Sequence, residues 1–180
     1  MTKQKFESNQ EIIKNIIQTF PGLRFNEIKK EGSMANGTLQ HHLSVLKKSG
    51  VIIADYDNVT PRFFVKEIDS DSRIIIKRLT QPTTSKIIKL LLEKECQIFS
   101  QMVKYTKKSA GTVSIYKNVL LKDGIIKGDT GSCSSCRKAT HKIKYRLTDS
   151  EKVRAIVLDY GKTSLQKSVD NLSDVFLSLK

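Results

Sequence analysis

Cys133, Cys136 and His141 are the side chains in this 180-residue sequence whose types and spacing could bind a metal or change redox state. Two thiolates and an imidazole could supply three ligands of a tetrahedral zinc site, but no nearby Cys or His offers a fourth. Arg137 and Lys138 would favour the thiolate forms, so a reversible Cys133–Cys136 disulfide is a second alternative. An inert loop is the third. The sequence leaves all three open.

A second group of polar residues, between positions 36 and 44, could recognise bases. Leucines recur there at helical spacing, so polar side chains fall on or near the opposite face of one helix. Asn and Gln can pair a donor and an acceptor with a base edge in the major groove. We expect Gln40 and Asn36 to contact bases, and Thr38 and His41 to reach a base or a phosphate. The full set of expected DNA contacts on this helix is Asn36, Thr38, Gln40, His41 and Ser44.

The charge of the chain favours a polyanionic partner. Its formal net charge is +14 and its pI is near 9.7. Residues 69–148 carry most of it, +11 from 17 basic and 6 acidic residues, whereas residues 1–68 carry +3 and residues 149–180 are neutral. The neutral end is therefore better suited to contact protein than phosphate.

An internal repeat divides the chain. Shifting the sequence by 74 residues superposes residues 13–55 on residues 87–129 without a gap, with Phe25 falling on Phe99 and Gly50 on Gly124. Such self-similarity indicates two copies of one structural unit. The segment Asp69-Ser70-Asp71-Ser72 then reads as the boundary between them.

The pattern within each copy predicts three helices followed by a hairpin. In the first copy, apolar spacing predicts a helix from Ile12 to Phe20, a second from Asn26 to Lys30 and a third over 34–49. Strands at 51–53 and 62–65 form the hairpin. In the second copy we expect helices over 85–95, 100–107 and 109–123, strands over 124–127 and 142–147, and a longer loop between the strands.

This order of elements predicts a mainly α fold with small β-hairpin wings: two tandem winged helix-turn-helix domains and a C-terminal helix. The expected bounds are residues 1–68 for the first domain, 69–148 for the second and 149–180 for the C-terminal helix.

The third helix of the first copy carries a family resemblance. Gly37-Thr38-Leu39-Gln40-His41-His42-Leu43, followed by Leu46 and Gly50-Val51-Ile52, resembles the signature of ArsR/MarR-type winged-helix regulators. The segment from Pro21 to Ile28 is similar to the lead-in of tandem winged-helix regulators common in archaea. The resemblance covers roughly residues 10–148. It implies a DNA-binding transcriptional regulator, a structural role for His42, and an Arg in the minor groove at Arg62.

The second copy departs from this signature at Ile115, Tyr116 and Lys117, so its surface favours phosphates over bases. Its expected DNA contacts are Lys104, Lys107, Lys108, Thr112, Ser114, Lys117, Arg137 and Lys138.

The C-terminal segment predicts an association helix. Thr148-Asp149-Ser150-Glu151 has the form of a capping box, and Leu158, Leu165, Leu172 and Leu179 follow at intervals of seven. This pattern favours a homodimer formed through residues 150–179, which suits a two-fold DNA site. Packing of the same stripe on its own domain is the alternative.

The sequence also excludes some classes of protein. No apolar run is long enough to span a membrane, and the first ten residues lack the apolar stretch of a signal peptide, so we expect a cytoplasmic protein with no membrane partner. Nothing supports an enzyme, because there is no GxxxxGK phosphate loop and no complete metal cluster. No cofactor is expected, apart from the zinc alternative.

We therefore expect a sequence-specific regulator that binds double-stranded DNA through major-groove helices and basic wings. Two alternatives remain: a tandem winged-helix scaffold that binds proteins, or a metal- or redox-sensing repressor acting through Cys133 and Cys136. Cys96 is expected to be a small core residue.

Overall fold

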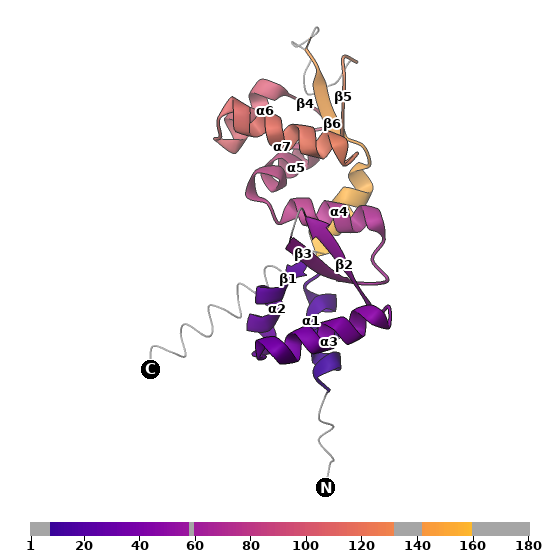
Figure 1. Cartoon of the computed structure of the whole chain (residues 1–180). Coiled ribbons are helices and arrows are strands. Elements are labelled where there is room, and N and C mark those ends of the chain that lie inside the picture. Colours follow the sequence, from indigo (N-terminus) through magenta and orange to yellow (C-terminus); the bar gives the residue numbers. More distant parts are fainter. Residues whose placement is uncertain (1–7, 58–59, 132–141, 160–180) are drawn as a thin grey trace, which may run out of the picture. The chain divides into compact units, whose positions relative to one another are not determined.

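The computed structural model describes residues 8–57, 60–131 and 142–159 (Figure 1). These residues form two compact units, which divide between Arg73 and Ile74.

The first unit contains three helices and a small sheet. Its first helix begins at Ser8, whose hydroxyl accepts a hydrogen bond from the Glu11 amide over 3.3 Å, while the Glu11 carboxylate accepts one from the Ser8 amide over 2.9 Å. The elements are α1 (Asn9–Thr19), β1 (Leu23–Arg24), α2 (Phe25–Gly32), α3 (Asn36–Lys48), β2 (Ile52–Asp57) and β3 (Thr60–Val65).

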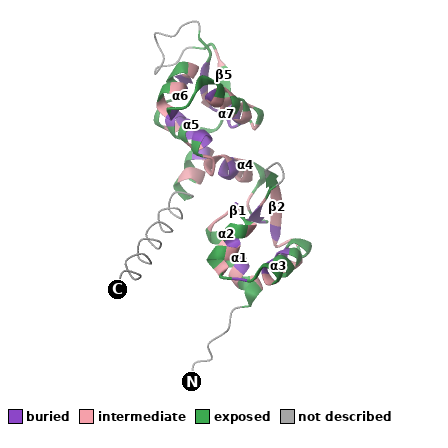
Figure 2. Ribbon diagram, turned by 60° about the vertical axis from the view of Figure 1, so that its left-hand side comes forward, coloured by how far each residue is buried: buried purple, intermediate pink, exposed green. Residues whose placement is uncertain are grey.

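The sheet of this unit has the antiparallel order β1-β3-β2, with Leu23 opposite Phe63 and Ile52 opposite Val65. The helices bury one apolar face each, as the colouring of Figure 2 shows. The buried core consists of Ile13, Ile17, Ile28, Met34, Leu39, Leu43, Leu46, Ile52, Phe63 and Val65.

The second unit repeats this order of elements. It begins within α4 (Ser70–Leu79), which starts in the first unit, and ends with a helix over 150–159. Its sheet has the antiparallel order β4-β6-β5. Between these ends lie α5 (Pro82–Glu93), β4 (Gln97–Ile98), α6 (Phe99–Thr106), α7 (Ala110–Lys122), β5 (Ile126–Asp129) and β6 (Lys144–Leu147).

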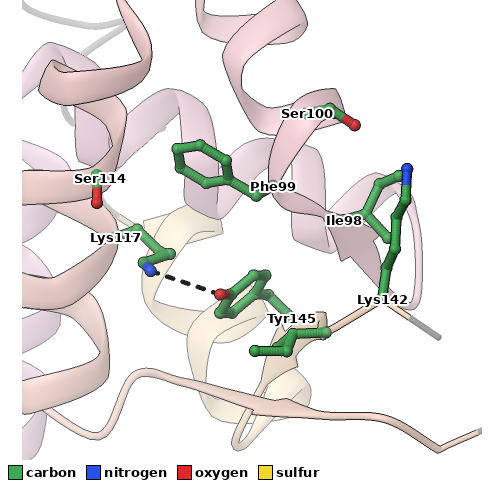
Figure 3. Close-up of a pocket in the computed structure, with 8 residues that line it drawn as sticks. Ile98, Phe99, Ser100, Ser114, Lys117, Lys142 and Tyr145 are labelled. Atoms are coloured by element: carbon green, nitrogen blue, oxygen red, sulfur yellow. Dashed lines mark hydrogen bonds between the residues drawn. The ribbon is translucent and has the colours of Figure 1, made fainter.

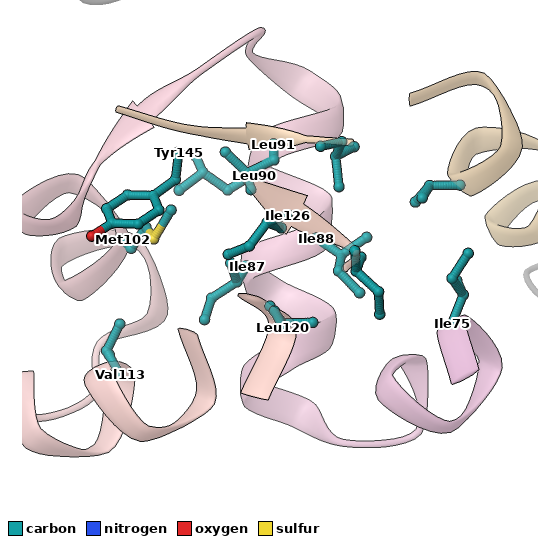
Figure 4. Packing of buried hydrophobic residues seen from close by; sticks show 13 residues of the cluster. Ile75, Ile87, Ile88, Leu90, Leu91, Met102, Val113, Leu120, Ile126 and Tyr145 are labelled. Carbon is teal, nitrogen blue, oxygen red and sulfur yellow. The ribbon is translucent and has the colours of Figure 1, made fainter. Parts of the chain in front are cut away.

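The core of the second unit is built around α5 (Figure 4). Ile87 and Ile88 are fully buried, and each such side chain contributes about 1.5–3 kcal/mol relative to exposure. Met102 from α6 and both Val113 and Leu120 from α7 belong to the same cluster.

The two units correspond closely in backbone detail. The bounds of β1, α2 and α3 differ from those of β4, α6 and α7 by 74 residues. Ser33 and Lys107 both adopt the left-handed conformation, with φ of 48° and 56°, and Gly50 and Gly124 have φ of 71° and 69°. The return strands are offset by 82 instead, since Val65 opposes Ile52 and Leu147 opposes Ile126. The second hairpin therefore has eight more residues than the first.

Helix starts differ from the sequence prediction at several places. Helix α2 follows Arg24, whose amide donates to the Glu27 carboxylate over 2.7 Å, so Asn26 does not cap it. Helix α6 likewise starts at Phe99, which places Ser100 inside the helix. Helix α5 begins three residues before the predicted Ser85, with Pro82 in the first turn, where its missing N–H is not needed.

Helix α4 was not predicted, because its first residues were interpreted as a domain boundary. Ser and Asp favour turns and helix N-termini for the same reason: their side chains bind nearby backbone amides. Here the Asp69 carboxylate accepts a hydrogen bond from the Ser72 amide over 3.0 Å, which starts the helix.

The described part of the C-terminal helix packs on the second unit. Asp149, rather than Thr148, caps it by accepting a hydrogen bond from the Lys152 amide over 2.9 Å. Val153 is buried in the core of the unit, whereas Leu158, the first leucine of the heptad row, is 58% exposed. The later leucines, Leu165, Leu172 and Leu179, lie outside the described residues, so association through residues 150–179 stays a prediction.

Candidate nucleic-acid interface

The exposed face of α3 carries the side chains predicted to read bases. Leu39, Leu43 and Leu46 point into the core, which turns the opposite side of the helix outward. Four of the five predicted residues are exposed and Thr38 is half-buried; the exposed ones are Asn36, Gln40, His41 and Ser44.

A shallow pocket of about 360 Å³ lies between α3 and the hairpin of the same unit. Gln40 and Ser44 line it from the helix, together with Lys47. Tyr56, 57% exposed on β2, lines it from the hairpin. Sequence analysis missed Lys47 and Tyr56. The segment after Asp55 is rich in turn-forming residues, so the sequence did not predict that the strand extends to Tyr56. Lys47 is one of many lysines, and nothing in the sequence set it apart from the others.

His42 lies beside the leucine stripe. It is half-buried, and its ring meets that of His41 edge-on, with 5.2 Å between the centroids. Its Nε2 atom lies 3.5 Å from Nδ2, the side-chain amide nitrogen of Asn9 on α1. This position against α1 suits a packing residue better than a groove contact.

Arg62 does not reach outward from the wing as the family resemblance implied. Its side chain is only 4% exposed, and Nη1 donates a hydrogen bond to the carbonyl oxygen of Gly22 over 2.8 Å. Arg62 sits in the middle strand of the sheet, opposite Arg24 on one side and Asp55 on the other. This burial argues against the predicted minor-groove contact, because the guanidinium is held at the Gly22 carbonyl inside the unit.

The second unit presents cations around the start of α7. Lys104 and Lys108 are exposed, and Lys107 is exposed in the left-handed turn between α6 and α7. Ser109 caps α7, and its hydroxyl lies 2.8 Å from that of Thr112. The half-buried Thr112 is thus engaged in the cap, although sequence analysis assigned it to DNA.

The outward face of α7 is less polar than that of α3. Ile115 occupies the position equivalent to His41 and is 65% exposed. Ser114, equivalent to Gln40, is half-buried. This face therefore offers fewer donors and acceptors to a base edge than the face of α3.

Lys117 was predicted to contact phosphate but points inward. It is half-buried, and its Nζ atom lies 5.2 Å from the ring centre of Tyr145 and 5.6 Å from that of Phe99. It also donates a hydrogen bond to the Tyr145 hydroxyl over 3.4 Å. Because Lys117 replaces the core residue Leu43 of the first unit, the helix directs it toward the sheet and away from the exposed face.

The described parts of the second hairpin mix exposed and engaged cations. Lys127 and Lys142 are exposed. Lys144 is buried and donates to the carbonyl oxygen of Gly131 over 2.7 Å, while Arg146 pairs with Asp129 over 2.8 Å. The predicted contacts Arg137 and Lys138 lie outside the described residues.

The predicted metal ligands Cys133, Cys136 and His141 also lie outside the described residues. Among residues 8–57, 60–131 and 142–159, no group of three His, Cys, Asp or Glu side chains is arranged to hold a metal. Cys96 is fully buried, as predicted for a core residue, and it is also disulfide-bonded.

Comparison with known protein families finds a match over the first part of the chain. Residues 7–76 match a family model described as an N-terminal HTH domain, a helix-turn-helix. This match supports a helix-turn-helix DNA-binding regulator and covers α1 to α3, the hairpin and most of α4. No curated protein matches the chain.

One solved structure similar to this chain is the DIP2311 protein from Corynebacterium diphtheriae, with 13% identity and a TM-score of 0.29. The alignment covers 77% of this chain and 26% of that protein, so this chain spans about a quarter of its length.

In the described part of the chain, no helix is both long enough and apolar enough to cross a membrane.

Proposed function

We propose that the chain is a sequence-specific transcriptional regulator that binds double-stranded DNA through two tandem winged helix-turn-helix domains. The observation that carries the proposal is the exposed polar face of α3, within the unit that matches the helix-turn-helix family model. Gln40 and Asn36 occupy that face and would contact base edges, because their amides offer a donor and an acceptor together.

The pocket between α3 and the first hairpin also supports binding of α3 in the major groove. A helix that lies in the major groove brings the adjacent hairpin close to the DNA backbone. Lys47 and Tyr56 border this pocket and can both donate hydrogen bonds to phosphate oxygens. They would fix the orientation of α3 while Gln40 selects the sequence.

The second domain contributes affinity more than specificity in this proposal. Its described residues place Lys104, Lys107 and Lys108 on the surface around the start of α7, whereas the outward position equivalent to His41 holds Ile115. Cations bind phosphates of any sequence, and an isoleucine side chain offers a base only apolar contact. The net charge of +11 in residues 69–148 agrees with this division of labour.

Two measurements on the full chain test the proposal. Selection from a random double-stranded DNA library should enrich one recurring motif. Binding to that motif should weaken steeply with salt, by roughly 10³–10⁵-fold between 50 and 200 mM if about 6–10 phosphates are neutralised.

Failure to enrich a motif, or binding that is insensitive to salt, would contradict the proposal. A protein-binding scaffold would give that result. A sensor acting through Cys133 and Cys136 would give the same motif, with an affinity that changes on adding zinc or an oxidant.

A further inference from the structure

A pocket of about 440 Å³ opens on the second unit, between α6, α7 and β6 (Figure 3). This volume lies in the range typical of small-molecule sites. Ile98, Phe99, Ile143 and Tyr145 supply its apolar walls, and Ser100, Ser114, Lys117 and Lys142 its polar groups.

Lys117 is the unusual residue of this pocket. Its ammonium lies over the rings of Phe99 and Tyr145, at 5.6 and 5.2 Å from their centres. Within the described residues, no carboxylate forms an ion pair with it; its one hydrogen bond goes to the Tyr145 hydroxyl.

The first unit shows that the fold does not require this cation. At the positions equivalent to Lys117 and Tyr145 it has Leu43 and Phe63, both buried, and it keeps the same helix and strand geometry. Both units therefore have a pocket between the third helix and the hairpin, and the pair of donors occurs in the second unit alone. A Leu and a Phe at these two positions would be enough to pack the helix against the sheet. The two hydrogen-bond donors therefore indicate a ligand.

We propose that this pocket binds a small organic carboxylate with an apolar body. The carboxylate accepts hydrogen bonds from the Lys117 ammonium and from the Tyr145 hydroxyl, which still has its own proton to donate. The apolar body lies against Ile98 and Ile143, the latter 53% exposed without a ligand. Lys142, exposed at the rim, adds a second positive charge near the entrance.

The site follows from this unit alone and needs no DNA. Its effect on DNA rests on the proposed function, because α7 would carry phosphate contacts. A bound carboxylate neutralises Lys117 beside that surface, so it should weaken DNA binding.

The test is an NMR titration of the full chain, without DNA, using benzoate and hexanoate as probes. We expect saturable shifts at Phe99, Lys117 and Tyr145 with at least one of the two. Acetate, which lacks the apolar body, and inorganic phosphate should bind roughly 10-fold more weakly or worse.

The variants Lys117→Leu and Tyr145→Phe install the residues that the first unit already tolerates, so both should fold. Lys117→Leu should weaken binding of the carboxylate by roughly 10-fold or more, because it removes a charged hydrogen bond. Benzamide is the neutral analogue of benzoate. Its affinity should fall far less than that of benzoate when Lys117 is replaced by Leu. Lys86→Leu, an exposed lysine that does not line the pocket, is the matched control and should change nothing.

Absence of binding, equal binding of benzamide and benzoate to wild type, or an unchanged affinity in Lys117→Leu would overturn the proposal. Phosphate binding as tight as benzoate would also overturn it and would make the pocket a contact for the DNA backbone. A carboxylate that binds without changing DNA affinity would leave the site standing and count against the placement of α7 on DNA.

Discussion

Arg62 donates a hydrogen bond from Nη1 to the carbonyl oxygen of Gly22 over 2.8 Å. The Gly22 amide in turn donates to the carbonyl oxygen of Phe63 over 2.9 Å. Gly22, in the turn between α1 and β1, is thus bonded to β3 through both its amide and its carbonyl. Arg62 therefore serves the stability of the first unit.

Arg62→Met should lower the free energy of unfolding of the first unit by about 1.5–3 kcal/mol, because it keeps the apolar stem and removes a hydrogen bond from a charged donor. Denaturant unfolding of the full chain measures this. Lys66→Met, an exposed cation just after β3, is the control and should change stability little. Weaker DNA binding with unchanged stability would instead restore the minor-groove role.

Gln40→Ala should relax the sequence preference of DNA binding by about 1–3 kcal/mol at the base pair it contacts, and Asn36→Ala should do the same at another position. Competition between the selected motif and single-base variants gives these energies. Gln18→Ala, which removes an exposed amide from α1, should leave the preference intact. An equal loss on every DNA sequence would show that α3 contacts only the backbone.

Lys104→Gln and Lys108→Gln together should lower the salt dependence of DNA binding, reducing the slope of log affinity against log salt by about 0.9 for each lost phosphate contact. The preferred motif should stay the same. Lys86→Gln, which removes one exposed cation from α5, is the control and should leave the slope unchanged. A slope unchanged in the double variant would mean that the cations around α7 do not touch the duplex.

Replacing glycine by alanine should change stability in opposite directions at two kinds of position. Gly50→Ala and Gly124→Ala should each destabilise the protein by about 1 kcal/mol, because their φ values of 71° and 69° are unfavourable for any residue with a Cβ. Gly37→Ala, in the first turn of α3 with no atom near the added methyl, should be neutral or stabilise by up to about 1 kcal/mol. Thermal unfolding of the three variants checks this; a common sign would show that backbone conformation does not decide the effect.

The amino-acid sequence was a good guide to the amphipathic helices and a poor one to their ends. The spacing of Leu39, Leu43 and Leu46 predicts α3 within two residues at each end, because burial of one face dominates. Helix starts such as that of α2 depend on which side chain reaches a free amide. In α2 the Glu27 carboxylate does so at the Arg24 amide, whereas the sequence pattern favoured Asn26.

The site residues were predictable where exposure follows from helix periodicity, as at Gln40 and Ser44. Lys117 was mispredicted because its charge was taken as a sign of exposure, and Arg62 because the family resemblance implied an arginine that reaches out from the wing. For Lys117 the sequence held the corrective signal, since the 74-residue repeat aligns it with the core residue Leu43. For Arg62 it did not, because its burial depends on the partner strands on both sides.

Association through the C-terminal segment can be tested by a chain that ends after Asp159. This truncation keeps Val153, which belongs to the core of the second unit, and removes Leu165, Leu172 and Leu179. If those leucines pair two chains, sedimentation should change from a dimer to a monomer while the thermal unfolding of both units is preserved. DNA affinity should fall with it, since one chain then contacts one half-site. A solution mass per particle that matches one chain already in the full-length protein would show that the leucine row packs internally; truncation before Ser150 cannot decide this, because it also removes Val153 from the core.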